Sequence, residues 1–304
     1  MKFAVAFALG LFGLNSFAFC NNPSSDDEVQ LREREIVHET QVVHNTAPSV
    51  PEYVVFAGDT IRFDTAEKYE RMDRELLTFT YMHSTSTLMI KRSERFFTMV
   101  EPILKEQGVP EDMKYLMVIE SNLDPKALSS AKAAGLWQFM KATAVQYGLE
   151  CNEYVDERYH IEKETAVACK YLKEAYAKYH DWMTVAASYN AGQGGISKRL
   201  ADQHQKSAME LWMAEETTRY MYRLLAAKML IEDPESFGFT VAERYPYIAP
   251  AKVIEVSDKE VDLVQLAEKN GVTYAELKRA NLWLRDSKLI NKTGKTYKIT
   301  IPAR

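Results

Sequence analysis

Hydrophobic positions recur at intervals of three and four residues along most of the chain, a spacing typical of amphipathic helices. The clearest case is residues 163–179, where Ala168, Tyr171, Leu172 and Ala175 fall on one stripe. The same spacing predicts further packing helices at residues 67–79, 93–107, 182–191 and 215–231, with a short helix at 141–147. We therefore expect a mainly α fold around one hydrophobic core.

Residues 110–140 combine this pattern with candidate chemistry. The spacing predicts a helix from Met113 onward, on which Met117 and Glu120 share the apolar stripe. A carboxyl in such a place is desolvated, which disfavours its charged form and raises its pKa. Glu120 is therefore a candidate general acid, and the alternative is an ordinary exposed glutamate at a helix end. Small residues at 127–135 would let a polymer approach.

The C-terminal residues follow a different pattern. Residues 252–256 and 296–301 are strand-like, and two segments of helical spacing, 262–269 and 274–280, lie between them. This order predicts a small βααβ module of the α+β class. The chain then divides into a signal peptide at 1–18, a linker at 19–52, a helical domain at 53–240 and this module at 250–304.

Composition narrows the choice of function and compartment. The chain has 304 residues, a hydrophobic content of 46% and a net charge of −5, so it can bury a sizeable core and offers no basic face for nucleic acid. Lys2 precedes a short apolar run typical of a signal peptide, which indicates export to the periplasm or cell envelope. Cys20 offers a lipidation site for membrane attachment, but the bulky Phe19 before it favours a product without a lipid anchor.

Cysteine, acidic and histidine positions lead to three further expectations. In an exported chain Cys151 and Cys169 are a candidate disulfide pair. We expect the segment Asp156-Glu157-Arg158 to hold an ion pair that anchors a turn. The six histidines are scattered, and the common zinc and calcium motifs are missing from the sequence, so no metal or cofactor is implied.

Three separated motifs resemble those of one family, the lytic transglycosylases with a goose-lysozyme-like (SLT) domain, of the membrane-bound transglycosylase D type. The first motif comprises Glu120-Ser121, Ala127, Ser129, Gly135-Leu-Trp-Gln-Phe139 and Thr143. The second is Ala186-Ala-Ser-Tyr-Asn-Ala-Gly192, and the third is Glu216-Thr217 with Tyr220. The C-terminal module resembles a LysM module in which Ser257-Asp258-Lys259 replaces the usual Gly-Asp turn.

This resemblance implies a lysozyme-like fold and cleavage of peptidoglycan glycan strands at the β-1,4 bond from N-acetylmuramic acid to N-acetylglucosamine. It implies that Glu120 serves as both acid and base. The product would carry a 1,6-anhydro-muramic acid end, because the family uses a hydroxyl of the substrate where hydrolytic glycosidases use a second carboxylate. The residues implied to bind substrate are Ser121, Ser129, Gly135, Leu136, Gln138, Phe139, Tyr189, Asn190, Glu216 and Tyr220, of which Tyr189 and Asn190 would contact sugar or orient Glu120.

Two alternatives keep the same fold. A catalytically silent peptidoglycan-binding scaffold is one, because Ala133 and Ser188 depart from the family motifs. A hydrolytic muramidase is the other, and it would need a second carboxylate beside Glu120, where the sequence places none. The acids that follow Glu120 in sequence include Asp124, Glu150, Asp156 and Glu157.

A third alternative is a penicillin-recognising enzyme. Ser129-x-x-Lys132, Ser188-Tyr-Asn190 and Lys292-Thr-Gly294 fit its three short motifs in the expected order. The last motif must lie on a central strand of a large sheet in such enzymes. The helical pattern of this chain predicts no such sheet.

Overall fold

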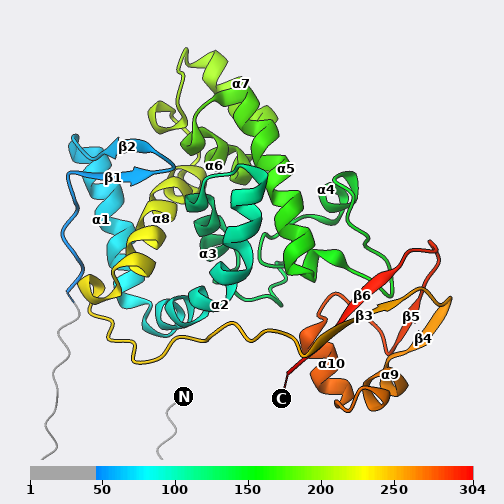
Figure 1. The fold of residues 1–304 in the computed structure, drawn as a ribbon. Coiled ribbons are helices and arrows are strands. Elements are labelled where there is room, and N and C mark those ends of the chain that lie inside the picture. Colours follow the sequence, from blue (N-terminus) through cyan, green and yellow to red (C-terminus); the bar gives the residue numbers. More distant parts are fainter. Residues whose placement is uncertain (1–45, 304) are drawn as a thin grey trace, which may run out of the picture. The chain divides into compact units, whose positions relative to one another are not determined.

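The computed structural model describes residues 46–303. The predicted signal peptide, Cys20 and most of the predicted linker lie outside the described residues. Most of the described chain is helical (Figure 1). The long helices are α1 (Ala66–Tyr81), α2 (His83–Gln107), α5 (Ile161–Tyr179), α6 (Trp182–Ala191), α7 (Gln193–Asp202) and α8 (Glu215–Glu232).

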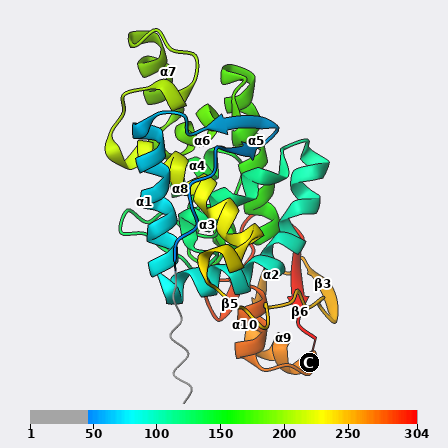
Figure 2. The same ribbon diagram turned by 90° about the vertical axis from the view of Figure 1, so that its left-hand side faces the viewer.

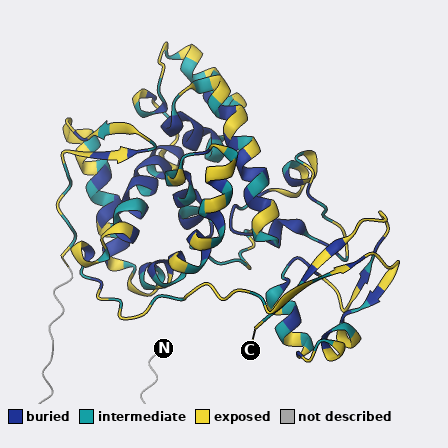
Figure 3. Cartoon of the chain, viewed as in Figure 1, coloured by how far each residue is buried: buried dark blue, intermediate teal, exposed yellow. Residues whose placement is uncertain are grey.

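One hydrophobic core joins these helices, as the periodicity predicts. Helices α1 and α8 run side by side (Figures 1 and 2), and α2 packs on α5. Buried residues gather on the faces where the helices meet (Figure 3). The fully buried side chains of this core include Trp137, Tyr115, Phe79, Met72 and Leu104. The mainly α fold class is confirmed.

Helix α3 (Tyr115–Ser121) lies inside this core, and the 3-10 helix η1 (Glu111–Lys114) leads into it. Its residues Tyr115 to Val118 are all buried, because a short helix that is apolar on every side must be covered on every side. The helix ends at Asn122, which has a left-handed backbone with φ of 52°, and Leu123 follows with φ of 54°. This sharp turn leaves Glu120 in the last turn of the helix.

An N-terminal hairpin precedes the helices and was not expected from the sequence. Strands β1 (Tyr53–Phe56) and β2 (Asp59–Arg62) pair antiparallel, from Tyr53 opposite Arg62 to Phe56 opposite Asp59. The turn residues Ala57 and Gly58 both have positive φ, which suits a tight hairpin turn. Burial alternates along β1, so one face of the hairpin joins the helical core.

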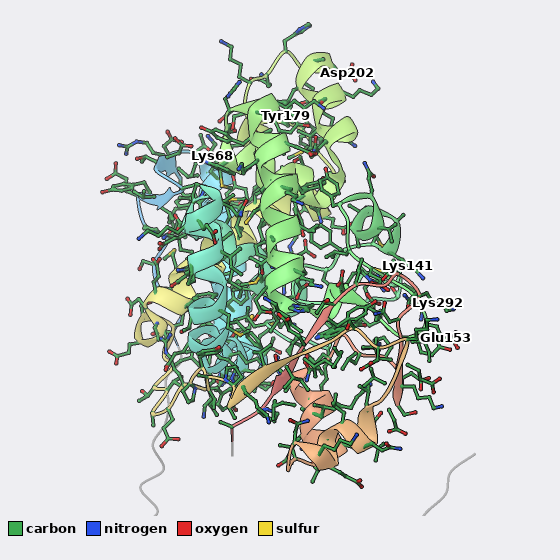
Figure 4. All side chains as sticks on the ribbon, turned by 45° about the vertical axis from the view of Figure 1, so that its right-hand side comes forward. Lys68, Lys141, Glu153, Tyr179, Asp202 and Lys292 are labelled. Atoms are coloured by element: carbon green, nitrogen blue, oxygen red, sulfur yellow. The ribbon has the colours of Figure 1, made fainter. Side chains whose placement is uncertain are left out.

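Helix α7 is a second unexpected element. It follows α6 directly at Gly192, whose φ of 77° ends α6. The hydroxyl of Tyr179, which lies at the end of α5 and is labelled in Figure 4, donates a 2.6 Å hydrogen bond to the backbone oxygen of Gln193. This bond ties α7 to α5. The short elements are α4 (Lys141–Gln146) and the 3-10 helices η2 (Glu157–Tyr159), η3 (Ala208–Glu210) and η4 (Pro234–Phe237).

The C-terminal residues form the predicted βααβ order. Strand β3 (Lys252–Val256) pairs antiparallel with β6 (Tyr297–Ile301), and helices α9 (Leu263–Lys269) and α10 (Tyr274–Ala280) lie between them in sequence. A further pair, β4 (Glu260–Asp262) with β5 (Lys288–Ile290), was not expected. These residues have a hydrophobic core of their own, which also includes Ala134, Val155 and Tyr159.

The predicted disulfide is not formed, since Cys151 and Cys169 are both free. Cys169 is fully buried in the helical core on α5, whereas Cys151 lies beside Asp156 in an isolated β-bridge. Within residues 46–303, none of the helices combines the length and the apolar character that crossing a membrane requires.

Candidate active site

Glu120 lies at an open cavity of about 490 Å³. Helix α3 brings the side chain to this place, because the apolar residues of the same helix are held in the core on its other sides. The wall of the cavity comes from the first half of α2, the end of α3 and the loop that follows α3. The residues that line it are Thr85, Leu88, Arg92, Glu120, Ser121, Asn122, Asp124, Ala127, Leu128, Ser129 and Gln138.

Two residues of α8 act on the Glu120 carboxyl. The hydroxyl of Tyr220 donates a 2.7 Å hydrogen bond to Oε1 of Glu120, and the guanidinium of Arg223 adds a favourable charge interaction. Both stabilise the charged carboxylate, but desolvation by burial outweighs them and raises the pKa of Glu120 from 4.5 to about 7. Glu120 can therefore both give and accept a proton near neutral pH.

The loop of residues 127–139 is held by a buried arginine. The Nη1 atom of Arg158 donates hydrogen bonds to the backbone oxygens of Lys132 (2.8 Å) and Phe139 (3.1 Å). Its Nε and Nη2 atoms bind the two carboxylate oxygens of Asp156 at 2.9 and 2.7 Å. The predicted Asp156–Arg158 ion pair is confirmed, and it also anchors this loop.

The backbone of Gly135 lies directly against Arg158 and Glu164. Its φ is +84°, and a Cβ atom there would overlap the backbone oxygen of Arg158 and Oε2 of Glu164. Only glycine fits, because both the conformation and the space exclude a side chain. Ser129 closes the neighbouring turn, where its hydroxyl accepts a 3.0 Å hydrogen bond from the backbone N–H of Ala133.

Trp137 and Gln138 connect the loop to the rest of the site. The hydroxyl of Tyr189 donates a 2.7 Å hydrogen bond to the backbone oxygen of Trp137. Gln138 adopts a left-handed backbone with φ of 50°, and its Nε2 atom donates to the backbone oxygens of Gly135 (2.8 Å) and Ala127 (3.3 Å). The amide of Gln138 is thus part of the cavity wall and also braces the loop.

Not every predicted substrate residue lies at the cavity. Leu136 and Phe139 are packed in the core, so the structure gives their side chains a packing role in place of the predicted contact. Glu216 is exposed in the first turn of α8 and is not part of the cavity wall. The hydroxyl of Tyr189 is held by the backbone oxygen of Trp137. Asn190 is half-buried, and its side-chain amide has no hydrogen-bond partner within residues 46–303.

One further carboxylate, Asp124, lines the same cavity as Glu120. The sequence placed no second carboxylate beside Glu120, and the structure corrects this because the turn after α3 brings Asp124 back to the cavity. The other three nearby acids are engaged elsewhere: Glu150 accepts from Tyr297, Asp156 binds Arg158, and Glu157 pairs with Lys163. No cluster of three or more His, Cys, Asp or Glu side chains that could hold a metal occurs in the described part of the chain.

Comparison with known proteins identifies the domain. Residues 99–211 match the family described as Transglycosylase SLT domain, and residues 252–304 match the Soluble lytic transglycosylase C-terminal LysM-like domain. Residues 99–211 are therefore similar to the SLT transglycosylase domain. The chain carries the LysM-like domain at residues 252–304, as the motifs of the sequence led us to expect.

The chain is also similar to individual curated proteins and solved structures. The chain is 25% identical over 257 residues to the membrane-bound lytic murein transglycosylase D of Escherichia coli K12, which covers 82% of this chain and 55% of that protein. It therefore spans about half the length of this curated relative. The 70 kDa soluble lytic transglycosylase of Escherichia coli and an inactive mutant of Slt from Pseudomonas aeruginosa each give a TM-score of 0.38 at 19% identity, covering 49% of this chain and 26% of theirs.

Some residues of the SLT site escaped the sequence analysis. Arg92 and Leu88 line the cavity from α2, and Arg223 acts on Glu120 from α8. Each follows the polar–apolar pattern of its helix, which gives no sign of a tertiary contact. Tyr220 was expected among the substrate residues, and the structure makes it the hydrogen-bond partner of Glu120.

The penicillin-recognising alternative finds no support in the geometry of this SLT chain. Ser129 and Lys132 lie in a tight turn and do not open a buried helix. The Ser188 hydroxyl is buried and donates to the backbone oxygen of Val185 at 2.8 Å. Residues 292–294 lie in the connection between two short strands, β5 and β6, which belong to separate two-stranded sheets (Figure 4 labels Lys292).

Proposed function

We propose that this chain is a peptidoglycan lytic transglycosylase that cleaves the β-1,4 bond between N-acetylmuramic acid and N-acetylglucosamine. The observation that carries this proposal is Glu120, a carboxyl with a pKa of about 7 at the open cavity of an SLT domain. An acid or base works best when its pKa lies near the working pH.

In the proposed reaction Glu120 acts twice. The protonated carboxyl gives its proton to the glycosidic oxygen, and the bond from that oxygen to C1 of the muramic acid breaks. The C6 hydroxyl of the same sugar then forms a bond to C1, and the Glu120 carboxylate takes the C6 proton. A 1,6-anhydro ring results, water is not consumed, and Glu120 regains its starting form. The Tyr220 hydroxyl stabilises the carboxylate between the two steps.

Substrate binding in this proposal rests on polar side chains with remaining hydrogen-bonding capacity. The hydroxyl of Ser121 donates to the backbone oxygen of Met117 at 2.9 Å and can still accept. The hydroxyl of Ser129 accepts from a backbone N–H and can still donate. Asn190, whose amide is without a partner in residues 46–303, and Gln138 complete the set that we assign to sugar hydroxyl and acetamido groups.

Export and domain division are part of the same proposal. The charged start and apolar run within residues 1–18 support a signal peptide, and a peptidoglycan substrate requires action in the cell envelope. We assign residues 53–240 to the catalytic part and 250–304 to a LysM-like module, with peptidoglycan glycan strands as the partner of the protein. Intact-mass measurement of the exported protein tests the removal of residues 1–18.

A hydrolytic muramidase is the second candidate, and Asp124 is the observation in its favour. Hydrolysing glycosidases normally use two carboxylates, and Asp124 lines the cavity that holds Glu120. Digestion of peptidoglycan in water enriched in the heavy oxygen isotope separates the two candidates. Transglycosylation leaves the new muramic acid end unlabelled and leaves Asp124→Asn active, whereas hydrolysis labels that end and requires Asp124.

A further inference from the structure

Glu164 is a buried acid of α5 that no part of the proposed reaction uses. Its side chain is fully buried, in the first turn of the helix. Its carboxylate oxygens accept hydrogen bonds from the backbone N–H groups of Leu136 and Trp137, both at 3.3 Å. No lysine or arginine pairs with it within residues 46–303, and the acids Asp156 and Glu162 act on it electrostatically.

A buried carboxyl without a paired cation is not expected to stabilise the fold. Burying an acid without a cation is unfavourable unless hydrogen bonds compensate, and an apolar side chain of similar size would avoid that penalty. The two compensating donors both belong to the loop that carries Gln138. Burial and the neighbouring acids raise the pKa of Glu164 well above its ordinary range, and the two N–H donors only partly oppose this.

The loop is fitted closely to this carboxyl. A Cβ atom at Gly135 would overlap Oε2 of Glu164, so the glycine brings the backbone directly against the oxygen. The indole Nε1 of Trp137 donates a 3.0 Å hydrogen bond to the hydroxyl of Thr165, the residue that follows Glu164 on α5. The first turn of α5 thus holds both the backbone and the side chain of Trp137.

The contacts of Glu164 are linked to the cavity through the backbone of Trp137 and Gln138. The N–H of Trp137 binds Glu164, and the backbone oxygen of the same residue accepts the hydrogen bond from Tyr189. Gln138 follows Trp137 and lies at the cavity. Its left-handed backbone is strained, and such strain persists only where the surrounding structure holds the loop in place. A shift of the Trp137 backbone would therefore move the Gln138 amide in the cavity wall.

We propose that Glu164 is a positioning residue: through the Leu136 and Trp137 N–H groups it fixes the loop that presents Gln138 to the substrate beside Glu120. The proposal rests on the proposed transglycosylase function for its kinetic consequence, while its structural consequence is independent of any activity. Its role is to place the sugar correctly for attack, so its loss should act mainly on turnover.

The test compares Glu164→Gln with Glu75→Gln in the full-length chain. Glu75, on α1, is equally buried, but it pairs with Arg219 of α8. Its hydrogen bonds and ion pairs do not involve residues 127–139, so Glu75→Gln controls for the loss of a buried acid. Gln at 164 presents an amide NH₂ group to one of the two loop N–H donors. We expect kcat to fall by roughly 10- to 100-fold with a smaller change in KM, as for a small misplacement of reacting groups, and Glu75→Gln to keep kcat.

Hydrogen–deuterium exchange supplies a readout that does not depend on activity. We expect faster exchange in peptides that contain the Leu136 and Trp137 amides for Glu164→Gln, and wild-type exchange there for Glu75→Gln. If Glu164→Gln does not fold, Glu164→Asp keeps the acid but falls one methylene short of the loop, and the same losses are expected. Wild-type kcat and wild-type exchange in either folded Glu164 variant would overturn the proposal. A wild-type protein without anhydro products would instead refute the proposed function.

Discussion

Tyr220 donates a hydrogen bond of 2.7 Å to the Glu120 carboxylate across the contact between α8 and α3. This bond favours the charged carboxylate and so holds the pKa of Glu120 below the value that burial alone would give. The two opposing effects leave the pKa at about 7. The Glu120–Tyr220 pair therefore sets the pH range in which the site can act.

Tyr220→Phe should move the pH profile of kcat/KM in a defined direction. Wild-type activity should fall above about pH 7, as free Glu120 loses the proton that it gives to the leaving oxygen. Without the Tyr220 hydroxyl the pKa of Glu120 rises, so the alkaline limb should shift to higher pH. Initial rates on purified peptidoglycan between pH 5 and 9 measure this, with the exposed Tyr81 (Tyr81→Phe) as the control. A lower or unchanged alkaline limb in Tyr220→Phe would contradict the assignment.

Glu120→Gln should stabilise the fold, but only at higher pH. Native Glu120 holds its proton up to about pH 7, whereas the unfolded chain releases it near 4.5, so the wild type loses stability as the pH rises through this interval. The variant has no proton to lose. Its free energy of unfolding should exceed that of the wild type by up to roughly 3 kcal/mol at pH 8 and match it near pH 4. Urea unfolding at both pH values tests this. An equal change in the free energy of unfolding at both pH values would show that burial does not raise the pKa of Glu120.

Gly135→Ala should be far more damaging than Gly108→Ala, although both glycines have positive φ. At Gly108 nothing lies within 4 Å of an added Cβ, so only backbone strain of about 1 kcal/mol is expected. At Gly135 the Cβ would overlap the Arg158 oxygen and Glu164, so the loop must move. We expect a loss of more than about 3 kcal/mol or of the native fold, measured by thermal unfolding. Equal losses in the two variants would argue against the close approach.

Periodicity was enough to predict most helices and the βααβ order, because long apolar stripes and whole strands leave a strong pattern. The β1–β2 hairpin has two strands of four residues, too short for such a pattern to stand out. In the sequence, Glu164 looks like an ordinary acid in the first turn of a helix. Arg223 likewise looks like an ordinary arginine beside an apolar stripe. Only the tertiary structure reveals their contacts with the loop and with Glu120.

The state of the cysteines can be measured directly. Burial is the largest cause that raises the thiol pKa of Cys151, to about 12, and of Cys169, to about 11, so little reactive thiolate exists near neutral pH. We expect neither residue to react with iodoacetamide at pH 8 in the native protein. Both should react after denaturation without reductant. Peptide mapping that finds labelling only after reduction would instead establish a disulfide.

The central claim is that Glu120 cleaves peptidoglycan by transglycosylation. The most direct measurement is mass spectrometry of the soluble products after purified sacculi are digested with the wild type or with Glu120→Gln. The wild type should release muropeptides lighter by one water than the hydrolytic products, because an internal hydroxyl closes the 1,6-anhydro ring. Glu120→Gln should fold and bind sacculi but turn over at least ~10²- to 10⁴-fold more slowly, since its amide cannot deliver a proton. Reducing muramic acid ends alone, or full activity in Glu120→Gln, would contradict the account.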